Sequence, residues 1–143
     1  MFFRNQYYFL SNMYPCKVEL IINGQKMLFH CSESAFQAQK NINEAHRFVE
    51  LDGFQAKKLG RKIEITTPDW DNEGRLIAMK RVLHAKFSNP LLKQKLLQIS
   101  EPIVEENTWN DTFWGVCNGK GLNILGLMLE NEKKASNFLF LFS

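Results

Sequence analysis

KVELIINGQKMLFH, residues 17–30, is the stretch that most constrains the fold. Two β-prone runs, 17–22 and 26–30, flank Asn23-Gly24. Both turn residues tolerate the positive φ of a tight connection between strands, so the stretch predicts a β-hairpin. SESAFQAQK, residues 32–40, predicts a helix directly after it. We expect Ser32 to cap that helix, because a serine hydroxyl can accept from the free amides of a first turn.

The middle of the chain predicts further helices. Residues 44–62 indicate two short helices that are broken at Asp52-Gly53. Pro68 separates them from a longer helix that starts near Asp69 or Asp71. The apolar stripe of the longer helix consists of Leu76, Met79 or Lys80, Leu83 and Phe87.

Towards the C-terminus, Asn89-Pro90 caps and opens a helix that runs to about Ser100, and residues 103–106 can form a short strand. A final helix carries Leu122, Leu125 and Leu129. The apolar tail Phe138–Phe142 is expected to dock on the core or on a partner. The elements predict an α+β fold, mainly helical with a small mixed or antiparallel β-sheet, in a single domain of residues 1–143.

The composition is that of a soluble globular protein, with 45% hydrophobic and 23% charged residues. The net charge of +3 is mild, and it excludes the charge density of a dedicated nucleic-acid binder. Two local basic groups are solvated helix faces or, in the alternative interpretation, contacts for a phosphate-bearing ligand. They are Lys57, Lys58, Arg61 and Lys62, and then Lys80, Arg81 and Lys86.

The three cysteines are odd in number and lack CxxC spacing, which favours reduced thiols over a disulfide framework or a zinc site. The three histidines are scattered, so we expect no metal and no cofactor. No apolar run reaches membrane-spanning length, and the N-terminus lacks the plan of a secretory signal. The expected location is cytoplasmic.

Within the predicted helix, Glu33, Gln37 and Lys40 project from nearly the same face. Glu33 lies in the first turn, where the helix dipole favours a carboxylate. One interpretation is a solvent-facing helix with ordinary polar residues. The other is a catalytic face, which the apolar segments on both sides favour because they would enclose the helix.

Tryptophans accompany carboxylates elsewhere in the chain. NTWNDTFWG, residues 107–115, suits a rigid loop that presents an aromatic face beside Asp111. The alternative is a loop that its Trp side chains pin to the core, with Asp111 capping a turn. Trp70 lies between Asp69 and Asp71, either of which can serve as an N-cap.

Together these segments resemble the YbiA-like, or NADAR, family over about residues 3–128. The N-terminal matches are FLSNMYP, residues 9–15, and SESAFQAQK, which matches the S-E-x-x-F-Q-A-x-K helix. The central matches are Gly60-Arg61-Lys62, Asp69-Trp70 and the segment from Met79 to Phe87. The C-terminal matches are Trp109-x-Asp111-x-x-Trp114-Gly115 and Gly121-x-Asn123-x-Leu125-Gly126.

The resemblance implies an α+β enzyme that hydrolyses N-glycosidic bonds at ribose. Members of the family act on phosphoribosylated intermediates of riboflavin biosynthesis, or remove ADP-ribose from guanine in nucleic acid, often beside a toxin. The first activity is the expectation here, and the second is the alternative. The expected partner is a small phosphoribosyl or ADP-ribosyl molecule, with nucleic acid only as an ADP-ribosylated substrate. A rival from another class is a non-catalytic module that binds ADP-ribose or another nucleotide.

Residue roles are implied by the matched motifs. The catalytic candidates are Glu33, Lys40 and Asp111. The substrate-binding candidates are Arg4, Phe9, Ser11, Asn12, Gln37, Arg61, Trp70, Trp109, Trp114 and Asn123. The chain departs from the family at Thr66-Thr67-Pro68, where an Arg usually precedes Asp-Trp, so phosphate recognition would use Arg4, Arg61, Lys62 or another cation. It departs again at Leu129-Glu130-Asn131, where a basic residue is usual.

The chemistry assigns Glu33 as acid or base if burial raises its pKa towards neutrality. Lys40 has two open roles. It can hold phosphate as a cation, or attack C1 of the ring-opened sugar as an amine and form a Schiff base, which requires a depressed pKa. Asp111 can orient a ribose hydroxyl or stabilise an oxocarbenium-like centre, and Trp109 and Trp70 would stack on the base.

Overall fold

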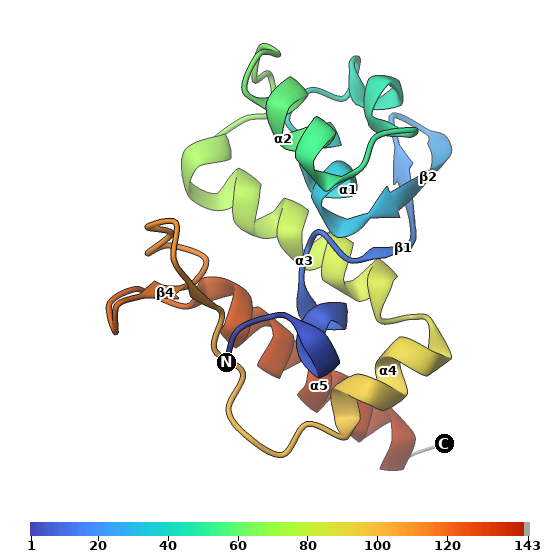
Figure 1. Cartoon of the computed structure of the whole chain (residues 1–143). Helices are drawn as coiled ribbons and strands as arrows, with labels where there is room; N and C mark the ends of the chain where they lie inside the picture. The colour runs from blue at the N-terminus through green and yellow to red at the C-terminus, as the bar shows by residue number, and fades with distance from the viewer. Residues whose placement is uncertain (142–143) are drawn as a thin grey trace. The chain divides into compact units, whose positions relative to one another are not determined.

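The β-hairpin predicted around Asn23-Gly24 is present (Figure 1). The computed structural model describes the backbone of residues 1–141 and the side chains of residues 1–137. Its contacts divide the chain into two units. We call Ser11–Lys86 the hairpin unit, and Met1–Leu10 with Phe87–Ser143 the terminal unit. A single domain over residues 1–143 stays a prediction.

The hairpin unit contains β1 (Pro15–Ile22), β2 (Gln25–Cys31), α1 (Ser32–Ala38), η2 (Ala45–Phe48), α2 (Gly53–Gly60), η3 (Trp70–Gly74) and α3 (Arg75–Lys86). The two strands pair antiparallel, with φ of 52° at Asn23 and 75° at Gly24, as a type I′ turn requires. Alternate residues face the core and are buried: Val18, Ile22, Met27, Phe29 and Cys31. The hairpin packs against α1 and α3.

Helix α1 follows β2 directly, and all seven of its residues are buried. The prediction that Ser32 caps it is wrong, because the cap position is Cys31 and Ser32 is already helical. The backbone carbonyl of Asn12 instead accepts from Glu33 N at 2.8 Å. An acceptor from a distant turn therefore replaces the local side-chain cap.

The break predicted at Asp52-Gly53 is confirmed. Asp52 and Gln55 form a capping box at the start of α2, with Gln55 N donating to Asp52 Oδ1 at 2.8 Å and Asp52 N donating to Gln55 Oε1 at 3.0 Å. The element before the break is a single 3-10 turn, η2, since residues 45–48 alone are helical there. Helix α2 packs against α1, and Gly60 at its C-terminal end approaches Gln37 of α1.

The longer helix begins with a π-helical turn, η3, which continues into α3. Asp69 has a left-handed φ of 54°, and its carboxylate accepts from Glu73 N, so Asp69 is the N-cap. The buried residues of α3 are Ala78, Met79, Val82, Leu83 and Lys86. Met79 and not Lys80 faces the core, whereas Leu76 is only half-buried.

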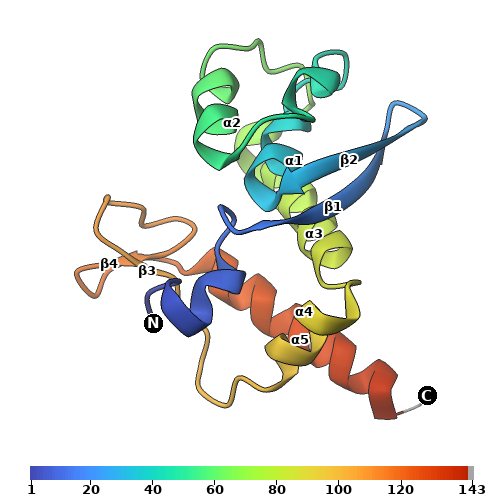
Figure 2. The same ribbon diagram turned by 45° about the vertical axis from the view of Figure 1, so that its right-hand side comes forward.

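The terminal unit contains η1 (Asn5–Leu10), α4 (Pro90–Leu97), β3 (Glu106–Asn107), β4 (Val116–Cys117) and α5 (Ile124–Leu141). Asn89 Oδ1 accepts from Leu91 N and Leu92 N, which confirms the predicted cap of α4. The helix ends three residues before Ser100. Figure 2 shows α4 lying against α5, which buries Leu125 and Leu129.

Two sequence predictions in this unit are wrong. The predicted strand at 103–106 is only the two-residue strand β3, which pairs in parallel with β4. Leu122 precedes α5 and is exposed. For the predicted tail Phe138–Phe142, α5 continues to Leu141, and the side chains lie outside the described residues. The fold is α+β and mainly helical, with two separate two-stranded sheets.

Candidate active site

Glu33 is buried in the first turn of α1, with only 6% of its surface exposed. Gln37 Nε2 donates to Glu33 Oε1 at 2.8 Å, one turn along the helix. Burial raises the pKa of Glu33 because the charged carboxylate is desolvated. The Gln37 hydrogen bond and the charges of Lys57, Lys40 and Arg61 oppose this rise. The predicted rise in pKa is confirmed in direction.

Gln37 is held between Glu33 and the end of α2. A Cβ on Gly60 would lie 2.7 Å from Gln37 Cδ and closer still to Oε1, so only glycine leaves room for this side chain. Gln37 Oε1 is buried without a hydrogen-bond partner among the described residues. Gly60 therefore fixes the position from which Gln37 donates to Glu33.

Lys40 lies two residues beyond the end of α1 and is half-buried. Its Nζ donates to the carbonyl of Gly60 at 3.2 Å, and its own carbonyl accepts from Thr66 N and Thr67 N. Desolvation lowers the pKa of Lys40, although the charge of Glu33 opposes this change. The predicted polar face is thus brought together, with Glu33 and Lys40 both joined to Gly60, one through Gln37 and one directly.

Two cations of α2 and its C-cap complete the cluster. Lys57 and Arg61 lie one helical turn apart, and the charges of both act on Glu33. Arg61 is exposed and Lys57 is half-buried, so both can meet a charged group from solvent. Arg61 is a predicted site residue, whereas Lys57 belongs to a basic group that the sequence assigns either to a solvated helix face or to contacts with a phosphate-bearing ligand. Its spacing of four residues from Arg61 was the signal that could have found it.

Ser11 and Asn12 lie in the turn before β1, and this turn contacts the start of α1. Ser11 Oγ accepts from Met13 N at 3.1 Å, and the Ser11 carbonyl accepts from Lys86 Nζ at 3.0 Å. Asn12 supplies the carbonyl that receives Glu33 N, and its side-chain Oδ1 is buried without a partner among residues 1–137. The turn therefore places Asn12, a predicted substrate-binding residue, beside the first turn of α1, where Glu33 lies.

Lys86 is a buried residue that sequence reasoning assigned to a basic group. Its side chain is fully buried, and desolvation lowers its pKa to about 8. It fixes the turn at Ser11, with its ammonium 5.8 Å from the centre of the Tyr14 ring. Its burial depends on contacts between segments 75 residues apart. A local sequence pattern therefore does not predict that Lys86 is buried.

Trp70 also lies in the hairpin unit, but it is 7% exposed and packs on Phe36, with ring centres 5.2 Å apart. The same ring lines a cavity of about 280 Å³ that neither Glu33 nor Lys40 lines. Trp70 thus belongs to the core and to a cavity wall on the Phe36 side of α1.

The loop at 107–115 lies in the terminal unit. Asp111 Oδ1 accepts from Phe113 N at 3.1 Å and from Trp114 N at 2.9 Å, which is the turn-capping arrangement. Trp109 is 61% exposed and does not pin the loop to the core, and Trp114 packs edge-to-face on Phe113. The loop is held by Asn107, whose Nδ2 donates to the Asp111 carbonyl and whose Oδ1 accepts from Asp111 N, and it presents the Trp109 indole to solvent.

The remaining predicted site residues are in the terminal unit as well. Asn123 Oδ1 accepts from Glu105 N, and its Nδ2 donates to the carbonyl of Ile103, so its amide brackets the chain before β3. Arg4 lies over the ring of Phe2 at 4.7 Å. Phe9 is buried, with Lys95 Nζ 5.7 Å from its ring centre. These contacts describe structural roles and leave the predicted binding roles untested.

Neither a metal site nor a membrane-spanning helix is found among the described residues. Among them, no three His, Cys, Asp or Glu side chains are grouped so as to hold a metal ion. None of the described helices combines the length and the apolar composition needed to cross a membrane.

A family model and a solved structure are both similar to this chain, and they agree with each other. The family model for the NADAR domain matches residues 1–135. The NMR structure of the E. coli protein YbiA is similar over 99% of this chain and 86% of that chain, with 25% sequence identity and a TM-score of 0.80. None of the curated proteins matches the sequence. The family resemblance read from the sequence motifs is confirmed, and so is the α+β fold.

Proposed function

We propose that this chain, which belongs to the NADAR domain family, hydrolyses the N-glycosidic bond between ribose and a base-like amine in phosphoribosylated intermediates of riboflavin biosynthesis. A glycosidase-like role is supported at the level of the family. The observation that carries the proposal is the buried Glu33 carboxyl, which accepts from Gln37, together with the half-buried Lys40 amine, which donates to the Gly60 carbonyl.

Cleaving an N-glycosidic bond requires a proton on the departing nitrogen. Because burial raises the pKa of Glu33, its carboxyl keeps its proton to higher pH than an exposed glutamate does. Gln37 donates to Oε1, so the proton resides on Oε2, which is the oxygen left to act as general acid. The unpartnered Oδ1 of Asn12 can accept from a sugar hydroxyl or an amine of the substrate.

Lys40 supports the Schiff-base route, because a lowered pKa increases the fraction of neutral amine. A proton on the ring oxygen lets the lone pair of the substrate nitrogen open the sugar ring, which breaks the bond between C1 and the ring oxygen and leaves a C=N bond between C1 and the base. The Lys40 amine then adds to C1 and expels the base amine, so one C=N bond replaces another. Water finally hydrolyses the imine, which returns the Lys40 amine and releases ribose 5-phosphate.

Phosphate recognition is assigned to Lys57 and Arg61. Both are close enough for their charges to act on Glu33, and Arg61 is exposed. Arginine binds phosphate through two parallel N–H donors. These cations fit the predicted need for a replacement of the family arginine at Thr66-Thr67-Pro68.

The roles of the terminal unit remain part of this proposal. Trp109 exposes an indole face on which a base can stack, and Asp111 Oδ1 is already committed to two backbone amides. Asp111 would therefore act on the substrate through Oδ2. The proposed location is cytoplasmic, which three free cysteines fit.

The test is incubation of the purified chain with the two riboflavin intermediates and, in parallel, with ADP-ribosylated DNA. We expect release of ribose 5-phosphate from an intermediate, and loss of this activity in Glu33→Gln with an unchanged circular dichroism spectrum. Release of ADP-ribose alone would transfer the same chemistry to the alternative substrate. Saturable binding of either compound without a released sugar would establish the non-catalytic module instead.

A further inference from the structure

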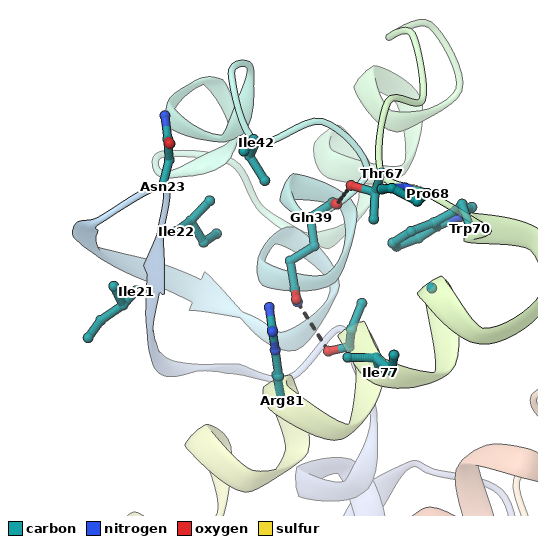
Figure 3. A pocket seen from close by; sticks show the side chains of 12 residues that line it. Ile21, Ile22, Asn23, Gln39, Ile42, Thr67, Pro68, Trp70, Ile77 and Arg81 are labelled. Carbon is teal, nitrogen blue, oxygen red and sulfur yellow. Dashed lines mark hydrogen bonds between the residues drawn. The ribbon is translucent and has the colours of Figure 1, made fainter.

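The cavity lined by Trp70 lies in the hairpin unit, between the hairpin turn, α3 and the segment after α1 (Figure 3). Its volume is about 280 Å³, just below the lower end of the range of roughly 300–1,000 Å³ for small-molecule pockets. Glu33 and Lys40 do not line it. At about 100° per residue, Gln39 lies roughly 120° around the chain axis from Glu33, so the cavity opens on a different side of this segment.

The wall of the cavity is apolar over about half of its surface. Ile21, Ile42 and Ile77 come from three separate segments, and each exposes 45% or more of its surface although all three line the same hollow. The Trp70 ring, packed on Phe36, adds a rigid flat surface. Exposed apolar side chains gathered around one concavity are a feature of ligand and partner sites.

One polar group on the wall has a fixed orientation. Gln39 is 6% exposed, and its Nε2 donates to the carbonyls of Ala35 at 3.2 Å and Ala78 at 3.1 Å. Both amide hydrogens are thereby used, and Oε1 is left as an acceptor on a side chain that cannot turn without losing two hydrogen bonds. The cavity thus contains one oriented acceptor that fits an N–H or O–H donor.

Arg81 supplies the charge. It is exposed and lines the cavity, and among the side chains of residues 1–137 no carboxylate forms a salt bridge with it. Figure 3 shows Arg81 extending from α3 in the direction of the Gln39 side chain. A guanidinium beside an acceptor and apolar walls matches an anionic group that neighbours a hydrogen-bond donor on a flat ring.

We propose that this cavity binds a small planar aromatic carboxylate that carries an N–H or O–H donor next to its carboxylate. The ring packs between the isoleucines and Trp70, the carboxylate pairs with Arg81, and the donor bonds to Gln39 Oε1. The volume limits the ligand to one ring or one fused pair of rings. This site is distinct from the proposed active site, and its occupant is an effector or a carried metabolite and not the glycosidase substrate.

The probe is indole-2-carboxylate, titrated into the full chain with isoleucine methyl groups and tryptophan indoles observed by NMR. We expect saturable shifts at Ile42, Ile77 and Trp70. Benzofuran-2-carboxylate, which lacks the N–H donor, and indole-2-carboxamide, which lacks the charge, should each bind about tenfold more weakly, since one such polar contact is worth on the order of 1.4 kcal/mol.

The variants separate this site from the rest of the molecule. Arg81→Gln should weaken indole-2-carboxylate about tenfold but leave indole-2-carboxamide unchanged. Arg47→Gln, an exposed arginine of the same unit, is the matched control and should bind as wild type. Ile42→Glu should abolish binding by placing a like charge at the rim, and Glu33→Gln should retain it. Absence of saturable shifts at millimolar probe, equal binding by Arg81→Gln, or loss of binding in Glu33→Gln would each overturn the proposal.

Discussion

Replacing Gly60 with alanine should disable the site without unfolding the chain. The new Cβ would lie 2.7 Å from Gln37 Cδ, whereas ordinary contact begins at 3.4 Å. The Gln37 side chain must therefore retreat by at least about 0.7 Å, which lengthens its 2.8 Å hydrogen bond to Glu33 beyond the usual limit. Because the obstacle is the far end of a flexible side chain and not backbone, the helix itself can accept the substitution.

The magnitude follows from what that hydrogen bond contributes. A hydrogen bond between two neutral groups is worth about 0.5–1.5 kcal/mol, which corresponds to roughly a 2- to 10-fold loss in kcat if the orientation of Glu33 is lost. Stability should change little, because one hydrogen bond is displaced and the added methyl group meets a flexible side chain and not backbone.

The assay is the pH dependence of ribose 5-phosphate release. A general acid works in its protonated form, so the rate falls as pH rises through the pKa of Glu33. The Gln37 hydrogen bond lowers that pKa, so Gly60→Ala should raise it and move the alkaline limb to higher pH. In a Gln37→Ala background, Gly60→Ala should have almost no further effect, since the two changes act through one contact. Full activity with an unmoved alkaline limb in Gly60→Ala would refute the arrangement of Gln37 described above.

Three further predictions concern Lys40, Asp111 and Lys86. Borohydride added during turnover should trap a covalent adduct at Lys40 that Lys40→Met lacks; an active enzyme that yields no adduct would leave Lys40 as a phosphate-binding cation. Asp111→Asn keeps the Oδ1 acceptor for Phe113 N and Trp114 N and should unfold like wild type, whereas Asp111→Ala should lose about 0.5–2 kcal/mol; reduced kcat in Asp111→Asn at unchanged stability would identify a role in the reaction. The pKa of Lys86 is about 8 when folded against an ordinary 10.5, so the unfolded chain binds more protons between these values and stability rises with pH there. Denaturant unfolding at pH 8 and pH 10.5 should show wild type gaining on the order of 3 kcal/mol relative to Lys86→Met, and parallel pH profiles would contradict the burial of this amine.

The parts of the fold that the sequence predicts are those controlled by adjacent residues. Asn23-Gly24 sets the hairpin turn, Asp52 begins α2 and Asn89 begins α4, and each acts within four residues of itself. The cap of α1 was mispredicted because its acceptor comes from Asn12, about twenty residues earlier in the chain. Local rules weigh Ser32 alone, and they have no means to register a competing carbonyl from another turn.

In the candidate site, too, the features set by local spacing could be predicted from the sequence, and those set by distant contacts could not. Helical spacing was enough to put Glu33, Gln37 and Lys40 on nearly the same face, although Lys40 lies beyond the end of α1. The contribution of Gly60 could not be predicted from the sequence. A glycine at the end of a helix usually serves to terminate the helix, whereas here it leaves space for Gln37. Lys86 was hidden for the opposite reason, since a lysine in a basic group is normally solvated and this one is fully buried.

The pKa shifts of Glu33 and Lys40 bear on whether the Lys40 amine can act as a nucleophile. An ion pair between Glu33 and Lys40 would raise the amine pKa and lower the carboxyl pKa, and it would leave an ammonium that cannot attack C1. Burial acts on both groups in the other direction, and it is the largest cause of each shift, ahead of their mutual attraction. Desolvation therefore shifts both groups towards their neutral forms, a protonated carboxyl and a free amine. That is the state in which Glu33 can protonate the departing nitrogen while Lys40 adds to C1, so one physical cause prepares both partners of the proposed reaction.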